Sequence, residues 1–386
     1  MHIALDCAIL ETVTDLMRDP ALAVVVTLVA TVVATLTWLY PRKPRPTAAR
    51  LTPSEIEEQL ATLSHTVTRH WRQQLPKQGL DPAADLPVRP GWSADVDTAS
   101  PSLDVMFGGA ISGHIRRLHL TGRTTTTAAG DFLTLPTRQL VVLGRPGAGK
   151  SVLAGLLARD LQSKRRQLGR RVPVVFTAAG WRPRATPLTS WMADVLTLDF
   201  GIARATARQL IDLGAVMPIV DGLDECADPG TAVRQLHEWA QRDTPFVVTC
   251  RNRPFLDAHT DHGALARAAV VELRPLNPED SLNYLDPHRA ARWEKARDKI
   301  EQNETLATVL TSPLMVSLAR DRYRHIHPDE LCTMDQPETL SEVLLDQFIP
   351  MAFAEETGEY SAANAHRWLT FIAEHLHRRN SALIAW

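Results

Sequence analysis

The sequence is short of cysteine and of net charge, and it contains no internal repeat. Its four cysteines in 386 residues are far apart and show no CxxC spacing, so we expect neither a disulfide framework nor a cysteine-ligated metal site. Cys226 and Cys250 are expected to be small core residues. The net charge of −2 lacks the basic excess of most nucleic-acid-binding proteins, so we expect no direct nucleic-acid partner. No solenoid or propeller period is visible.

One long apolar segment stands out near the N-terminus. Residues 21–40 contain no charged side chain, and a helix of this length crosses the ~30 Å hydrocarbon core. Four basic residues follow within positions 41–50, whereas Arg18 is the only one before the segment. The positive-inside rule then places the C-terminal part in the cytoplasm. We expect a single-pass protein of the cell membrane; the alternative is a buried core helix.

The central motif is a glycine-rich turn that follows an apolar run. Residues 140–143 (LVVL) lead into GRPGAGKS, which fits the G-x-x-x-x-G-K-[ST] phosphate-binding loop between a strand and a helix. Its glycines let backbone N–H groups turn toward a phosphate, and the helix start adds its dipole. We expect Lys150 to neutralise the β- and γ-phosphates. The predicted nucleotide-binding residues of the loop are Gly144, Arg145, Pro146, Gly147, Ala148, Gly149, Lys150 and Ser151.

A second motif supplies acids. Residues 216–220 are an apolar run that ends in Asp221-Gly222-Leu223-Asp224-Glu225. Asp221, at the expected strand end, and the Ser151 hydroxyl are the predicted Mg²⁺ partners. Glu225 or Asp224 is the predicted group that orients and deprotonates the attacking water. The alternative, a solvated acidic turn, is weakened by the presence of the phosphate-binding loop.

The pattern along the chain predicts an α/β fold. Thr52-Pro53-Ser54-Glu55 is a capping box that opens an amphipathic helix to about residue 75, and the run 124–127 is expected to be a loop. From residue 140, continuous apolar strands alternate with amphipathic helices, which indicates a parallel sheet covered on both faces. After Pro275 the sequence becomes helical. The fold class is therefore a P-loop NTPase followed by an all-α region, with one N-terminal transmembrane helix.

Two further residues are candidates for contacts with the nucleotide. Arg251 follows the apolar run 246–249, so it is expected beside the phosphates, against the alternative of a surface arginine. Pro313 opens a helix in Ser312-Pro313-Leu314, which by itself indicates only a helix start.

Together these motifs resemble the NACHT family of STAND-type signalling ATPases. GRPGAGKS is similar to its phosphate loop, DGLDE after a strand is its most recognisable mark, and Thr249-Cys250-Arg251 resembles its sensor-1 position. Ser312-Pro313-Leu314 resembles the turn whose proline contacts adenine. Residues 86–89 and the apolar N-terminal segment resemble membrane-anchored NACHT proteins of actinobacteria.

The resemblance implies a switch that is closed with ADP and open or homo-oligomeric with ATP, and that responds to an unidentified protein or ligand. It implies a role in bacterial defence or stress signalling. Family members usually continue into a winged-helix domain, whose histidine touches the β-phosphate, and a repeat-built sensor. Here only His375 and His377 are candidates for that contact, against a solvated helix face, so we expect a truncated or short form.

Two functions of different classes fit these motifs. The first is a membrane-anchored switch that binds and hydrolyses ATP with Mg²⁺. The second is a nucleotide-binding membrane scaffold with negligible hydrolysis that acts by clustering, and an AAA+-like motor is a third. The acids of DGLDE favour the first. The expected segments are an extracytoplasmic N-terminus (1–20), the transmembrane helix (21–40), a linker, amphipathic helix and connector (41–135), the NTPase core (136–276), a helical domain (277–335) and a partial winged-helix region (336–386).

Overall fold

The computed structural model describes most of the chain from Leu51 onward. The described residues are 51–77, 92–93, 125–241, 244–262, 265, 268–286, 293–302, 308–323, 327–333, 336–346, 348–352 and 361–378. The predicted transmembrane segment 21–40 lies outside them. Among the described residues, no helix is both long and apolar enough to cross a membrane.

A six-stranded sheet forms the centre of the fold. Its order is β1-β6-β2-β5-β4-β3, and all neighbouring strands from β6 to β3 pair in parallel. The two-residue strand β1 (Trp92–Ser93) pairs antiparallel with β6 and lies inside the predicted connector. The bounds of the parallel strands are β2 Gln139–Leu143, β3 Val172–Thr177, β4 Val216–Asp221, β5 Phe246–Cys250 and β6 Ala269–Leu273.

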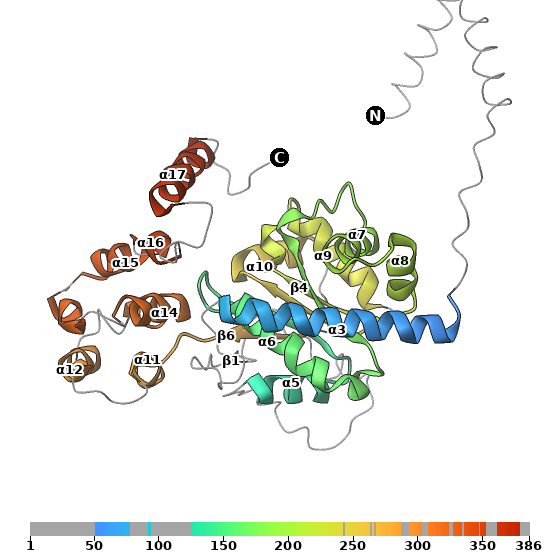
Figure 1. The fold of residues 1–386 in the computed structure, drawn as a ribbon, viewed down its shortest axis with the longest axis horizontal. Coiled ribbons are helices and arrows are strands. Elements are labelled where there is room, and N and C mark those ends of the chain that lie inside the picture. Colours follow the sequence, from blue (N-terminus) through green and yellow to red (C-terminus); the bar gives the residue numbers. More distant parts are fainter. Residues whose placement is uncertain are drawn as a thin grey trace, which may run out of the picture. The chain divides into compact units, whose positions relative to one another are not determined.

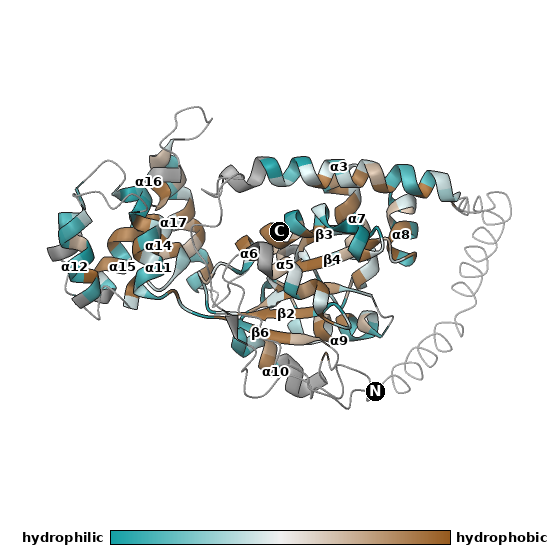
Figure 2. Cartoon of the chain, turned by 90° about the horizontal axis from the view of Figure 1, so that it is seen from below, coloured by the Kyte–Doolittle hydropathy of each residue, from teal (hydrophilic) through white to brown (hydrophobic). Residues whose placement is uncertain are grey.

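Helices cover both faces of the sheet, as the continuous apolar strands predicted (Figure 1). One face carries α5 (Thr125–Thr134) and α6 (Lys150–Ser163), whose apolar side chains pack on Leu140 and Val142. The other face presents Val141 and Leu143. The helices on that face are α7 Leu188–Phe200, α8 Arg204–Asp212, α9 Pro229–Ala240 and α10 Asn252–His262. In Figure 2 the strands β2, β4 and β6 are drawn mainly in brown, the hydrophobic end of the colour scale. Cys226 and Cys250 are buried free thiols, as expected.

The helix α3 (Pro53–Lys77) is part of this core. Its predicted capping box is present, because Glu55 Oε2 accepts from the Thr52 backbone N–H at 2.7 Å and Thr52 Oγ1 accepts from the Glu55 N–H at 3.4 Å. Leu63 and Val67 are fully buried in the core. α3 also lies on α6, where Trp71 covers Gly155 so closely that a Cβ added at Gly155 would stand 2.6 Å from Trp71 Cζ3.

We expect Gly155→Ala to lower stability, although alanine is the better helix former. The helix preference gains about 1 kcal/mol, but the clash with a rigid indole costs about 1–3 kcal/mol. The net loss of about 1 kcal/mol should appear as a fall in Tm of about 3 °C. Trp71→Ala together with Gly155→Ala should lose less than the sum of the two single variants. Additive losses would contradict the contact.

The chain after β6 is helical, as predicted. Asn277 caps α11 by accepting from the Asp280 backbone N–H at 2.6 Å. The helices that follow in the described residues are α11 Pro278–Leu285, α12 Glu294–Gln302, α14 Pro313–Arg322, α15 Pro337–Asp346, α16 Phe348–Ala352 and α17 Ala362–Arg378. A separate apolar core, which includes Tyr323 and Leu340, joins the helices α11, α12, α14 and α15.

One local prediction was wrong. In the run expected to be a loop, the described threonines 125–127 form the first turn of α5. Ala128, Ala129 and Phe132 follow it and are buried against β2 and α6. Threonine has a weak helix preference, and here the tertiary burial of the next turn overrides that preference.

Candidate functional site

The phosphate-binding loop connects β2 to α6 with the geometry that its glycines require. Gly147 and Gly149 have φ angles of 73° and 86°, a left-handed conformation that glycine adopts without penalty. Gly149 is the residue before the first turn of α6, and no side chain caps that helix start. The free N–H groups and the positive dipole end of α6 are therefore available to an anion.

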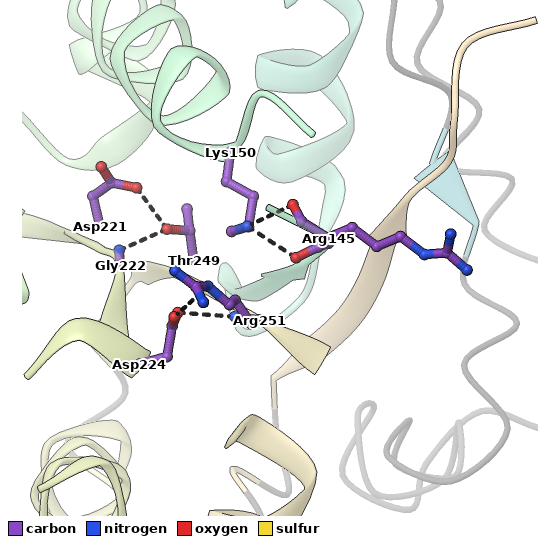
Figure 3. Close-up of polar contacts among 8 residues, drawn as sticks. Arg145, Lys150, Asp221, Gly222, Asp224, Thr249 and Arg251 are labelled. Carbon is purple, nitrogen blue, oxygen red and sulfur yellow. Dashed lines mark hydrogen bonds and ion pairs between the residues drawn. The ribbon is translucent and has the colours of Figure 1, made fainter. Parts of the chain in front are cut away.

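Lys150 is held inside the loop. Its ammonium donates to the carbonyl oxygens of Gly144 at 2.9 Å and Arg145 at 3.0 Å (Figure 3). An ammonium has three donors, so one remains for a phosphate oxygen. Burial, opposed by the charge of Asp224, lowers the pKa of Lys150. A phosphate at this position would relieve that cost of burying a cation.

Asp221 is fixed by a buried threonine. It ends β4 and is 9% exposed, and Thr249 Oγ1 on β5 donates to its Oδ1 at 2.6 Å. The same hydroxyl accepts from the Gly222 N–H at 2.8 Å. Thr249 therefore links the two neighbouring strands at their carboxyl ends, and Figure 3 shows its hydroxyl bonded to both Asp221 and Gly222.

We expect Thr249→Val to destabilise the core by about 2 kcal/mol, because a buried N–H and a carboxylate oxygen lose their shared partner while the volume is unchanged. Thr249→Ser, which keeps the hydroxyl and loses a methyl group, should cost about 1 kcal/mol. Urea unfolding of the two variants provides the measurement. A valine variant as stable as the serine variant would show that the bridge contributes little.

Asp224 and Glu225 have different environments. Asp224 accepts from the Arg251 backbone N–H at 2.9 Å through Oδ1, and its Oδ2 pairs with Arg251 Nε at 2.9 Å. The Asp224 side chain is 6% exposed, so the carboxylate of this ion pair is shielded from solvent. Glu225 lies over Gly222, where an added Cβ would be 3.0 Å from its Cδ. Partial burial and the charges of Asp224 and Asp221 raise the pKa of Glu225.

The start of α14 contacts the loop directly. The Gly147 carbonyl accepts two hydrogen bonds, from Ser312 Oγ at 3.2 Å and from the Leu314 N–H at 3.3 Å. A Cβ added at Gly149 would lie 3.7 Å from Pro313 Cγ. These partners are more than 160 residues apart in sequence and belong to the same compact unit, Leu51–Trp386. The helical region therefore closes one side of the loop.

These elements enclose a cavity of about 370 Å³, within the usual size of small-ligand sites. Most of the predicted residues line it: Pro146, Gly147, Ala148, Gly149, Lys150, Ser151, Asp221, Asp224, Glu225, Arg251 and Pro313. Gly144 and Arg145 contribute their carbonyls to Lys150 instead, and the Arg145 side chain points away from Lys150 (Figure 3). His375 and His377 are exposed on α17 and do not line the cavity.

The sequence interpretation missed part of the lining. Tyr284 of α11 and Ser317 of α14 line the cavity, and Arg320 lies 4.6 Å from the centre of the Tyr284 ring. Nothing in their local sequence marks them as site residues. Thr249 was recognised only as part of a motif, although a hydroxyl at the end of a buried strand is a signal that could have identified it.

The donor set fits Mg²⁺. Ser151 and three carboxylates line one cavity, and oxygen donors are the ligands that Mg²⁺ prefers. Within the described residues, no three His, Cys, Asp or Glu side chains are grouped so that they could hold a metal by themselves. That agrees with the usual Mg²⁺ site at a phosphate loop, which uses one or two protein oxygens, water and the substrate phosphates.

A phosphate-binding loop after β2, an acid at the end of β4 with β5 between the two strands, and a parallel arrangement of five strands together define a P-loop NTPase domain. The model of the NACHT domain family matches residues 138–291. The resemblance predicted from GRPGAGKS and DGLDE is thereby confirmed, and this segment is a NACHT domain. No curated protein matches the chain.

Several solved structures are similar to parts of the chain. The Orc1 protein of Aeropyrum pernix, in complex with DNA, has 12% identity and a TM-score of 0.36 over 58% of this chain and 65% of its own. A STAND protein with a tetratricopeptide repeat sensor from Pyrococcus horikoshii has 14% identity and a TM-score of 0.34 over 62% and 33%. A Walker-type ATPase of Pyrococcus abyssi has 12% identity and a TM-score of 0.36 over 74% and 79%. The chain thus spans about a third of the STAND protein, and similarities this low carry no argument about function.

Proposed function

We propose that this chain is a membrane-anchored switch that binds ATP and resets by slow hydrolysis. The observation that carries the proposal is the double hydrogen bond from the start of α14 to the Gly147 carbonyl. Because of these hydrogen bonds, the helical region and the loop that would hold the phosphates together form one wall of the cavity. A nucleotide that moves the loop therefore acts on the helical region as well.

Each residue has a role in this proposal. Lys150 and the loop N–H groups bind the phosphates, Ser151 and Asp221 hold Mg²⁺, and a bound Mg²⁺ would neutralise phosphate charge. Glu225 activates the attacking water, while Asp224 positions Arg251 toward the γ-phosphate. Pro313 and Tyr284, which line the cavity from the helical region, contact the base.

The membrane part of the proposal rests on the sequence. Residues 21–40 have the length and composition of a single span, and the basic residues after them orient the NTPase domain to the cytoplasm. We further propose that the ATP-bound form associates into homo-oligomers in signalling or defence and responds to a protein or ligand trigger. The expected segment boundaries 1–20, 21–40, 41–135, 136–276, 277–335 and 336–386 belong to the same proposal.

The second candidate is a nucleotide-binding scaffold that clusters the membrane span without hydrolysis. Glu225 favours the switch, because its raised pKa suits a general base. The full chain, purified in detergent, should retain ADP and turn over Mg²⁺-ATP slowly. Tight nucleotide binding without turnover would support the scaffold, and failure to bind either nucleotide would overturn both.

A further inference from the structure

A cluster of cations lies at the amino ends of the parallel strands, whereas the nucleotide cavity lies at their carboxyl ends. Arg138 directly precedes β2 and Arg171 directly precedes β3, and Arg171 Nε donates to the Gly214 carbonyl just before β4. The amino ends of these parallel strands therefore meet here, whereas the cavity lies at their carboxyl ends. The basic cluster, as we name it, consists of Arg138, Lys164, Arg165, Arg166, Arg170 and Arg171.

The charge of the basic cluster is almost unneutralised. Arg138, Arg165 and Arg171 donate to backbone carbonyls, which carry no full charge. In the described part of the chain, one salt bridge joins the cluster to an acid: Arg170 to Glu57 at 2.8 Å, with both side chains largely exposed. Burial and a neighbouring arginine lower the pKa of Arg165 and of Arg171. The cluster thus concentrates positive potential in a chain whose net charge is −2.

The backbone of the cluster is unusual too. Arg138 and Arg170 have φ angles of 51° and 65°, and among the described residues they are the only ones other than glycine with positive φ. Glycine or asparagine would fit such positions better. Strained backbone conformations of this kind cluster at functional sites. The Arg170 side chain has little structural use, since an exposed ion pair adds little stability.

We propose that the basic cluster docks on the anionic headgroups of the membrane in which the chain is anchored. This inference rests on the proposed span at residues 21–40. Ten residues separate Tyr40 from Leu51, and they can extend by at most about 35 Å. Leu51 precedes α3, whose second turn contacts the cluster through the Glu57–Arg170 pair. With the proposed span in the membrane, a linker of this length therefore allows the cluster to reach the headgroups.

Docking in this orientation has a consequence for the nucleotide site. Because the cluster is at the amino ends of the strands, the carboxyl ends, with the cavity and the start of α14, face the cytoplasm. Clusters of four to eight cations beside a membrane span are typical of anionic-lipid contacts. Nucleic acid is the less favoured polyanion, because the tether keeps the cluster at a lipid surface and the rest of the chain is acidic overall.

The test uses the full chain in vesicles of phosphatidylcholine with or without phosphatidylglycerol. We expect backbone amides of residues 164–171 to exchange hydrogen for deuterium more slowly on the anionic vesicles, and high salt to remove the difference. Each cation at such a surface changes the contact equilibrium roughly fivefold. The double variant Arg166→Gln, Arg170→Gly should therefore weaken the contact between the cluster and the anionic surface about 30-fold. Arg234→Gln, at an exposed cation on α9, is the matched control and should change nothing.

The outcomes separate the alternatives. Glycine suits φ +65° at position 170, so Tm should not fall in the Arg170→Gly variant; a large fall would show that Arg170 is structural. If residues 164–171 exchanged at the same rate on neutral and anionic vesicles while the chain still resisted alkaline extraction, the docking proposal would be overturned. The proposed membrane anchor would not be affected. Extraction of the chain from the vesicles by alkali would overturn the proposed membrane anchor. If the extracted chain still bound anionic vesicles, and if the basic cluster were needed for that binding, the docking proposal would stand. Equal protection by a DNA duplex on neutral vesicles would overturn the lipid assignment.

Discussion

Replacing Lys150 by alanine is expected to weaken ATP binding by about 100-fold. The ammonium is held 2.9–3.0 Å from the Gly144 and Arg145 carbonyls and faces the cavity. Among the described residues that line the cavity, it is the only lysine. A charged hydrogen bond contributes about 1.5–3 kcal/mol, and loss of the one donor that remains for a phosphate oxygen corresponds to a factor of about 10 to 150. Calorimetric titration with ATP and Mg²⁺ measures the effect directly.

The matched control is Arg145→Ala in the same loop. The Arg145 side chain points away from Lys150, and only its backbone carbonyl takes part in the site (Figure 3). This variant removes a neighbouring positive charge of the loop and should bind ATP within a few-fold of the original chain. The two variants should have similar Tm without nucleotide, and ATP should raise Tm only in the control. Equal loss in both would mean that net loop charge, and not the position of Lys150, determines binding.

The sequence predicted those parts of the site that are formed by consecutive residues. GRPGAGKS and DGLDE each encode a turn after a strand, and their geometry follows from local glycine and helix-start chemistry. The capping box of α3 was predicted for the same reason, since Thr52 and Glu55 are three residues apart. A parallel sheet followed from the apolar strands because such strands must be covered on both faces.

The missed parts depend on residues that are distant in sequence. Thr249 contacts Asp221 across neighbouring strands, and Ser312 contacts Gly147 across 165 positions. No periodicity encodes such pairs. Thr125–Thr134 became a helix because Phe132 could be buried against β2 and α6, a gain that the composition of the threonine run did not reveal. Likewise, the basic cluster forms only when the amino ends of β2 and β3 bring Arg138 close to Arg171.

The hydrogen bonds between the loop and α14 also explain why binding and hydrolysis can have separate effects. Gly147 has little room for change, because an added Cβ would stand 2.9 Å from Ser312 Oγ and 3.2 Å from Leu314 Cβ. Any shift of the loop must therefore move α14 or break its contacts. In the proposed switch, a nucleotide would shift the loop by occupying the cavity, whereas hydrolysis would also require a correctly placed base. The two steps can thus be separated by mutation.

Glu225→Gln is expected to preserve nucleotide binding and to slow hydrolysis by about 10²–10⁴-fold. The amide keeps the size of the side chain but cannot take a proton, and removal of a general base has effects of this order. Glu225 is the better candidate for the base because both oxygens of Asp224 are bonded to Arg251. In the described residues, no hydrogen bond holds the Glu225 carboxylate. Single-turnover hydrolysis of bound ATP separates the chemical step from binding.

Asp224→Asn and a pH series complete this test. Asp224→Asn removes the charge that holds Arg251 and should slow hydrolysis only about tenfold, through lost positioning. The raised pKa of Glu225 means that its base form is lost, as pH falls, at a higher pH than for an ordinary glutamate. The hydrolysis rate should therefore fall on the acidic side at that raised pKa, and Glu225→Gln should abolish this step in the profile. A larger defect in Asp224→Asn, with the acidic step unchanged in Glu225→Gln, would assign the base to Asp224.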